Sequence, residues 1–428
     1  MLNLTGDPEI RRVAGEIREK AAFGGYVISD VILREGGVEY QFVDLVMEGG
    51  GTLGVALVGY IHALEQANVR FLGMGGSSVG AIVALLAYGC GGRMEAKGER
   101  LAGIIGGMDL GSLVDDSRAA KMISKLFGEQ GVPFSVPKII LNLVLSLRQI
   151  VLLLRQISRT LGLNSGDMLY EWIADNLAEY GIHTLAELNA LTGKLPEGLT
   201  NRITGEPITE YDASIRIVAA DVTTSTKVVF PEMAPMYWQE PEGVNPACFA
   251  RASASIPLFF QPFNVGGISE IIEGGGKWER LGSFKGTLPG RVSFVDGGLL
   301  SNFPIDLFKR NGVPRAPTLG ARLGNKDRSA KDITSVGQYA GGLLSALRHY
   351  ADYDFIFKNP LYKYLIAHIP TEKYHWLDFN MGPEEKLGLF REGFMAGHRF
   401  LEGFDWEQYK ELRRAEIEIY RAHEKMKK

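Results

Sequence analysis

Ser78 lies between Gly76 and Gly80 in a G-x-S-x-G pattern, the frame in which a serine nucleophile occupies a sharp turn between a strand and a helix. Ser77 does not fit this frame, because the second residue after it is a valine. The small flanking residues leave room for strained backbone, and the apolar run at residues 80–88 predicts the helix that must follow. We therefore take Ser78 as the candidate nucleophile of an acyl-transfer site and expect ester hydrolysis.

A second glycine turn, formed by Gly49, Gly50 and Gly51, follows a strand-like run at residues 42–47 and precedes a helix predicted over 55–66. Backbone N–H groups in such a turn can hold the negative charge that develops on the carbonyl oxygen of an ester. The N-terminus of the following helix also favours negative charge. The N–H groups of Gly50 and Gly51 are therefore expected to form an oxyanion hole.

The same turn has a rival interpretation, because Gly49, Gly51 and Gly54 spell the dinucleotide-binding pattern G-x-G-x-x-G. A dinucleotide-binding unit places an acidic residue about 20 residues further on, at the end of the second strand, where it binds a ribose hydroxyl. Residues 67–93 contain neither Asp nor Glu. We therefore interpret the turn as part of the ester site and not as a nucleotide site.

A serine hydroxyl needs a base, and Asp296 is the candidate, because it ends an apolar strand-like run and precedes two glycines that let another segment approach. The usual aspartate pKa, about 3.9, makes it a weak base at neutral pH, but burial in a dry site raises the pKa. None of the histidines lies in a recognisable local motif, and we interpret His62, on a predicted amphipathic helix, as structural. The histidines are His62, His183, His349, His368, His375, His398 and His423.

The order of these motifs, G-G-G-x-x-G, then G-x-S-x-G about two dozen residues later, then D-G-G far downstream, resembles that of the patatin-like phospholipases. Three further segments resemble bacterial members of the family. They are the Ala/Ser-rich segment with its Pro-aromatic end at 250–262, the internal strand at 215–224, and the helix start at 163–167. The likeness runs from about residue 44 to about residue 401.

The resemblance implies a three-layer α/β/α fold with a central, mostly parallel sheet and a helical insertion. It makes Ser78 the nucleophile and Asp296 the base of a Ser–Asp dyad without histidine, and the amides of Gly49–Gly51 the oxyanion hole. The implied activity is a phospholipase A or lysophospholipase reaction through an acyl-enzyme, with no metal or organic cofactor. One departure is Leu53, which stands where the family usually has Arg or Lys.

The expected organisation is an N-terminal extension at 1–40, a patatin-like catalytic domain at 41–401 and a charged C-terminal helix at 402–428. Two insertions interrupt the catalytic domain, one at about 92–162 after the nucleophile helix and one at about 264–290. The second insertion is rich in glycine and is expected to be a loop that lies just before the strand of the candidate base.

The composition is that of an ordinary globular enzyme: 428 residues, 46% hydrophobic, 22% charged, with a net charge of −4. This charge argues against a nucleic-acid partner. Cys90 and Cys248 lie in apolar segments and are expected to be reduced core residues. The first residues lack a basic stretch followed by an apolar one, so we expect no signal peptide and a cytoplasmic location.

The first insertion contains an amphipathic segment at 139–159 with arginines on a second side. Its apolar stripe is Ile139, Leu143, Leu147, Ile150, Leu154 and Ile157, and its arginines are Arg148, Arg155 and Arg159. Polar residues interrupt the segment, which argues against a transmembrane span. A lid or a peripheral contact with the inner face of a membrane is one interpretation. A buried core helix or a subunit contact in a homo-oligomer is the other.

Three functions from different classes fit these features. The first is a lipid acyl hydrolase acting on phospholipids or other acyl lipids. The second is a non-lipid serine esterase or acyltransferase with a Ser–His–Asp triad, in which a histidine such as His349 or His398 is the base. The third is a catalytically quiet regulatory protein, an alternative that stands because Leu53 replaces the basic residue usual in the family. Replacing each histidine separates the first two, because only a triad enzyme should lose most of its activity. Failure of an organophosphonate to label Ser78 would favour the third.

Overall fold

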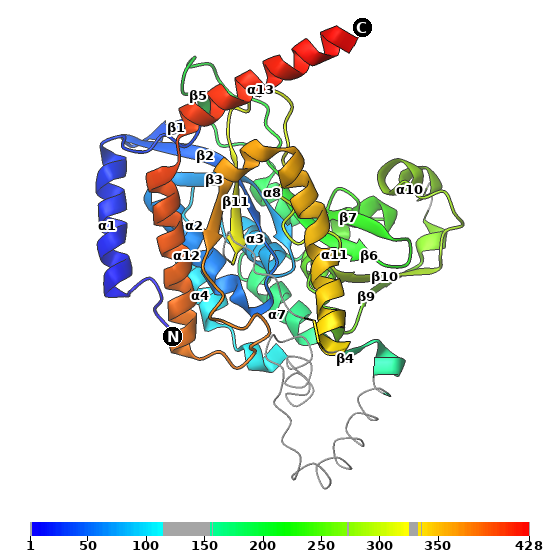
Figure 1. The fold of residues 1–428 in the computed structure, drawn as a ribbon. Helices are drawn as coiled ribbons and strands as arrows, with labels where there is room; N and C mark the ends of the chain where they lie inside the picture. Colours follow the sequence, from blue (N-terminus) through cyan, green and yellow to red (C-terminus); the bar gives the residue numbers. More distant parts are fainter. Residues whose placement is uncertain are drawn as a thin grey trace.

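The computed structural model describes residues 2–113, 155, 157–271, 274–324, 333–334 and 336–427. Within these residues the core is a ten-stranded mixed sheet, whose main path runs in the order β12-β11-β2-β3-β6-β10-β9 (Figure 1). The strands on this path are β2 (Val38–Met47), β3 (Val69–Ser77), β6 (Ile215–Asp221), β9 (Phe263–Gly266), β10 (Arg291–Asp296), β11 (Thr318–Leu323) and β12 (Ile366–Ile369). The strands beside it are β1 (Val31–Glu35), β5 (Thr200–Asn201) and β7 (Thr226–Phe230), while β4 (Gly162–Asn164) and β8 (Leu258–Phe260) form a separate pair.

The centre of the sheet is parallel: β12, β11, β2, β3 and β6 pair in the same direction. β10 pairs antiparallel with both β6 and β9. Every residue of β3 is buried, as expected of a strand with helices over both faces. Because β2 and β3 are parallel neighbours, their carboxyl ends meet at one edge, and the two glycine turns follow there.

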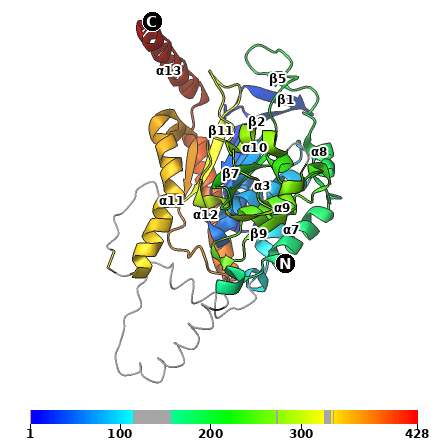
Figure 2. The same ribbon diagram turned by 90° about the vertical axis from the view of Figure 1, so that its right-hand side faces the viewer.

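The helices lie over both faces of the sheet and include α1 (Pro8–Ala22), α2 (Gly54–Gln66), α3 (Val79–Gly89), α4 (Gly98–Gly107), α7 (Asp167–Ala178), α8 (Leu185–Thr192), α9 (Ala247–Ser253), α10 (Gly274–Gly282), α11 (Val336–Lys358), α12 (Pro383–Gly403) and α13 (Trp406–Lys427). α2, α3 and α12 pack on one face, where Leu45 and Ile217 belong to the largest apolar cluster. Val46 and Val218 face the other side, which the segment 303–308, α11 and α13 cover. Figure 2 shows the sheet between α11 and the pair α7 and α8. The three-layer α/β/α fold is confirmed.

α2 and α12 touch backbone to backbone through glycines. A Cβ added at Gly59 would lie 2.1 Å from the carbonyl oxygen of Phe390, and one at Gly393 would lie 1.8 Å from that of Ala56. No side chain fits in these gaps, so the glycines set the distance between the two helices. This contact fixes α2, which begins directly behind the first glycine turn.

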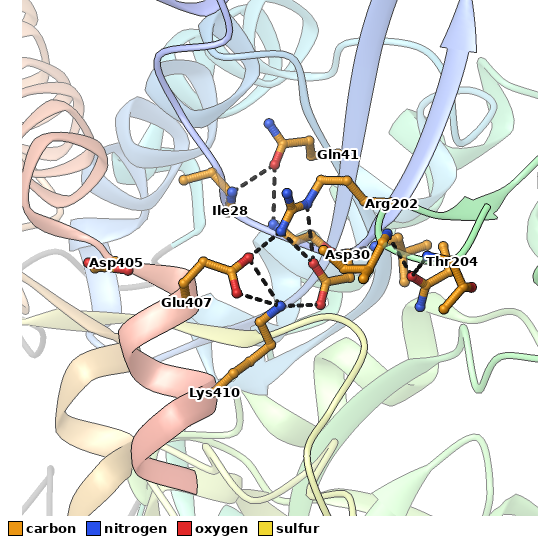
Figure 3. A network of polar contacts seen from close by, with 12 residues as sticks. Ile28, Asp30, Gln41, Arg202, Thr204, Asp405, Glu407 and Lys410 are labelled. Carbon is orange, nitrogen blue, oxygen red and sulfur yellow. Dashed lines mark hydrogen bonds and ion pairs between the residues drawn. The ribbon is translucent and has the colours of Figure 1, made fainter. Parts of the chain in front are cut away.

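The segment just before β1 and the first turns of α13 meet in a network of charged side chains (Figure 3). Asp30, just before β1, accepts hydrogen bonds from Lys410 Nζ on α13 at 2.6 Å and from Arg202 Nη2 at 2.8 Å. Glu407, also on α13, forms ion pairs with both cations. The side chains of Lys410 and Asp30 are only 3% and 8% exposed, so little water screens their attraction. Residues 1–40 and the C-terminal helix are therefore tied to each other.

The second insertion is not the loop that its glycines suggest. It begins within β9, which pairs with β10, and it contains α10. Trp278 on α10 is completely buried, and its Nε1 donates a hydrogen bond to the carbonyl oxygen of Met236 at 3.2 Å. Burial of this one indole is a tertiary contact that outweighs the low helix propensity of the preceding glycines.

The amphipathic segment expected at 139–159 lies, for the most part, outside the described residues. Within the described part of the chain, no helix has both the length and the apolar character that a membrane crossing requires.

Candidate active site

The candidate nucleophile occupies a strained junction between β3 and α3. Ser78 has a φ of 52° and a ψ of −125°, a left-handed conformation that a residue with a side chain rarely adopts. Its glycine neighbours allow the end of β2 to come close. A Cβ at Gly76 would lie 2.6 Å from the carbonyl oxygen of Met47, and a Cβ at Gly80 would lie 2.4 Å from the same atom. The structure thus gives Ser78 the backbone of a nucleophile elbow.

Ser78 and Asp296 meet although 218 positions separate them. The hydroxyl of Ser78 donates a 2.5 Å hydrogen bond to Oδ2 of Asp296. The other carboxylate oxygen, Oδ1, accepts from the amide of Gly298 at 2.7 Å. Ser78 is 2% exposed and Asp296 is 5% exposed, so the pair lies in a largely dry environment. This arrangement can pass the serine proton to the carboxylate as the oxygen attacks.

The first glycine turn packs against the elbow. A Cβ at Gly49 would lie 3.1 Å from the Cβ of Ser78. Of the three expected oxyanion glycines, Gly49 uses its own N–H, which donates to the carbonyl oxygen of Asn302 at 2.9 Å. Among the described residues, the amides of Gly50 and Gly51 have no acceptor. Two N–H groups of the turn therefore remain available for an oxyanion.

A segment far along the chain covers the outer side of this turn. Gly51 has a φ of 56°, and a Cβ there would lie 2.0 Å from the carbonyl oxygen of Trp376. The same oxygen accepts a 2.8 Å hydrogen bond from the amide of Thr52. Only glycine satisfies both the left-handed backbone and the contact with Trp376.

Asn302 and Glu48 support the turn, and the sequence reasoning missed both. Nδ2 of Asn302 lies 3.1 Å from the carbonyl oxygen of Gly49 and 3.1 Å from Oε1 of Glu48, and donates to both. The amide of Leu323 donates to Oε2 of Glu48 at 2.7 Å. Burial raises the pKa of Glu48 to about 7, against the opposing effect of the Arg322 charge. The one feature of the sequence that could have indicated Glu48 is its position directly before the glycines.

A second buried carboxylate, on α11, binds the two neighbours of Asn302. Asp352 accepts hydrogen bonds of 2.7 Å from the hydroxyl of Ser301 and from the amide of Phe303. Burial raises the pKa of Asp352. This segment begins at Ser301, five residues after Asp296. Glu48 and Asp352 therefore connect the loop that follows the candidate base to the oxyanion turn.

Leu53, the departure noted in the sequence, points into the protein. Its side chain is buried and belongs to the largest apolar cluster, and its amide donates to the carbonyl oxygen of Gly50 at 3.1 Å. A side chain at this position therefore packs in the core beneath the turn.

The Ser78 hydroxyl donates to a carboxylate and not to an imidazole. His62 is packed against the rings of Phe390 and Phe394, and burial lowers its pKa to about 4. This agrees with a structural role for His62. Nε2 of His398, on α12, lies 3.7 Å from Oε1 of Glu402 at the end of the same helix.

Comparisons with known proteins identify the family of the chain. The family model of the patatin-like phospholipases matches residues 45–309. The uncharacterized protein YqhO of Bacillus subtilis (strain 168) is 26% identical over 363 residues, which are 84% of this chain and 98% of that protein.

Two solved bacterial structures also align with much of this chain. VipD from Legionella pneumophila aligns with 88% of this chain and 70% of its own, at 18% identity and a TM-score of 0.41. ExoU, solved in complex with SpcU from Pseudomonas aeruginosa, aligns with 88% of this chain and 57% of its own, at 17% identity and a TM-score of 0.35. The family match covers more than half of the 428 residues. The chain belongs to the patatin-like phospholipase family.

Proposed function

We propose that this protein is a lipid acyl hydrolase of the phospholipase A or lysophospholipase type, with Ser78 as nucleophile and Asp296 as its base. The observation that carries the proposal is the 2.5 Å hydrogen bond between the Ser78 hydroxyl and the Asp296 carboxylate. Membership of the patatin-like phospholipase family supports a lipid ester as substrate.

In the proposed reaction, Asp296 takes the proton of the Ser78 hydroxyl while Oγ attacks the carbonyl carbon of the ester. The tetrahedral oxyanion accepts hydrogen bonds from the amides of Gly50 and Gly51. Collapse of this intermediate breaks the bond to the alcohol, which leaves with the proton held by Asp296. A water molecule then gives a proton to Asp296 and attacks the acyl-enzyme. Collapse of this second intermediate breaks the bond to Ser78 Oγ and releases the fatty acid, and Asp296 returns the proton to Oγ.

Burial of the site and its position at a helix N-terminus both favour the proposed reaction. The hydrogen bonds to an oxyanion are stronger in a site from which water is excluded. The elbow also places Ser78 at the N-terminus of α3, where the helix dipole favours negative charge. Both effects act on the charge that develops during attack, so they stabilise the transition state more than the bound ester.

A lipid substrate brings the enzyme to a membrane surface. We retain, as part of the proposal, a peripheral contact through the cationic segment 139–159. The exposed side chains of Arg155 and Arg159 are its described charges. Attraction of such cations to an anionic lipid surface contributes on the order of 1 kcal/mol each.

The test measures fatty acid release from mixed phospholipid vesicles by the wild type, Ser78→Ala, Asp296→Asn and His398→Ala. We expect both dyad variants to lose at least about three orders of magnitude in kcat, as for members of a catalytic unit, while His398→Ala keeps wild-type activity. Unchanged release by either dyad variant contradicts the mechanism. A comparable loss in His398→Ala favours a histidine triad, and no release by the wild type favours a quiet regulatory protein.

A further inference from the structure

Ser253, the last residue of α9, connects the nucleophile to the central sheet. Its hydroxyl accepts a 2.9 Å hydrogen bond from the amide of Ser78 and donates a 2.6 Å hydrogen bond to the carbonyl oxygen of Val218 in β6. Ser253 is completely buried. Because the hydroxyl proton is committed to Val218, the lone pairs of the oxygen face the Ser78 amide.

The Ser253 hydroxyl links β3 and β6 at the point where their regular pairing ends. The parallel pairing of β3 with β6 stops at Ser77, whose partner is Val218. The next residue, Ser78, turns into the left-handed conformation, so its N–H can no longer follow the ladder. The Ser253 hydroxyl supplies the acceptor that the ladder would have supplied. A buried amide without this acceptor would be destabilising, because it would lose its hydrogen bond to water and gain none in return.

The same short segment also holds the candidate base. The amide of Asp296 donates to the carbonyl oxygen of Ser255 at 2.8 Å. Both members of the dyad are thus tied to positions 253–255 by one hydrogen bond each. This segment therefore helps to set their relative position, in addition to the pairing of β10 with β6.

A buried arginine anchors this piece of backbone. Arg251 is 3% exposed, and its guanidinium donates to the hydroxyl of Ser255 at 2.5 Å and to the carbonyl oxygen of Gly166 at 2.9 Å. It also donates to the carbonyl oxygens of Ser165 at 2.6 Å and Gln261 at 2.9 Å. Arginine offers five donors in a rigid plane, so it fixes several segments at once.

We propose that Ser253 is a positioning residue of the hydrolase. Its hydroxyl holds the Ser78 amide so that Oγ stays directed at Asp296. It also occupies that amide, which leaves the oxyanion to Gly50 and Gly51. The inference rests on the proposed function, because it requires Ser78 to be the nucleophile.

The test compares Ser253→Ala with Ser253→Thr, which keeps the hydroxyl, in assays of a soluble short-chain ester. We expect Ser253→Ala to lower kcat by about 10- to 100-fold, the effect of a misplacement of about 1 Å, with KM within about twofold of wild type. Labelling of Ser78 by an organophosphonate should slow by the same factor. The threonine variant should recover most of the loss, a rescue that a purely structural role does not predict.

The matched control is Ser29→Ala, which removes an equally buried hydroxyl far from the dyad. Ser29 Oγ accepts a 3.0 Å hydrogen bond from the amide of Val31. We expect this variant to lose stability but to keep kcat. If Ser253→Ala does not fold, Ser253→Cys fills the same space with a weak hydrogen-bonding thiol and should show the same fall in kcat.

Folded Ser253→Ala or Ser253→Cys protein with wild-type kcat and wild-type labelling rate overturns the inference. The result of Ser78→Ala separates this failure from failure of the proposed function. If Ser78→Ala is inactive while Ser253→Ala is fully active, only the role of Ser253 is wrong. If Ser78→Ala is fully active, the proposed function itself is wrong.

Discussion

Gly51→Ala tests whether the geometry of the first glycine turn matters for catalysis. The new Cβ would lie 2.0 Å from the carbonyl oxygen of Trp376, at a residue whose φ is 56°. A left-handed alanine costs about 1–2 kcal/mol, and forcing an extra carbon into a packed site costs about 1–3 kcal/mol. The substitution should therefore lower the free energy of unfolding by about 2–5 kcal/mol.

The same substitution should displace the amides of Gly50 and Gly51, because the turn must move away from Trp376. Loss of one oxyanion donor lowers kcat by about 10²–10³, and we expect a fall of this size on a soluble p-nitrophenyl ester. Urea unfolding gives the stability of the same sample. The control is Gly15→Ala on α1, where a Cβ would meet no atom within 4 Å.

Gly15→Ala should raise the free energy of unfolding by about 0.5–1 kcal/mol, since it removes a helix-interior glycine, and leave kcat unchanged. A folded Gly51→Ala enzyme with wild-type kcat would refute the reasoning, because the turn would then tolerate the displacement that the contact with Trp376 imposes.

Three further predictions concern the fold. Burial lowers the pKa of His62 from 6.5 to about 4, so its contribution to stability is present above pH 6.5 and is lost as the pH falls through 4. The loss amounts to about 3 kcal/mol, and His62→Phe should flatten the dependence of unfolding free energy on pH in this window. Gly393→Ala should destabilise by about 1–3 kcal/mol, measured by urea unfolding, because its Cβ would lie 1.8 Å from the carbonyl oxygen of Ala56. Lys410→Met should destabilise by about 1.5–3 kcal/mol, read as a lower Tm, because it removes the 2.6 Å hydrogen bond to Asp30; an unchanged Tm contradicts this role for the network.

The parts of the site that were predictable from the sequence are local. Each glycine turn lies within a few residues of the strand before it and the helix after it, so glycine spacing and apolar runs were sufficient to predict both units. β3 ends at Ser77 and α3 begins at Val79, which leaves Ser78 at the junction as expected. The family and the three-layer fold follow from the order of the same motifs, and both are confirmed.

The supporting contacts were not predictable, because they join segments that only the topology of the sheet brings together. Ser253 is 175 positions from Ser78, and Asn302 is 253 positions from Gly49. Their residue types are ordinary, and no local pattern indicates a partner. The helix α10 was missed for a related reason, because burial of Trp278 and not local propensity decides that segment.

The most direct test of the central claim is to locate the adduct of a fluorescent organophosphonate by mass spectrometry of the labelled protein. We predict one modified residue, Ser78, with labelling abolished in Ser78→Ala, retained in Ser77→Ala and strongly slowed in Asp296→Asn. An adduct on Ser77, or labelling at the wild-type rate without the Asp296 carboxylate, would contradict the Ser–Asp dyad.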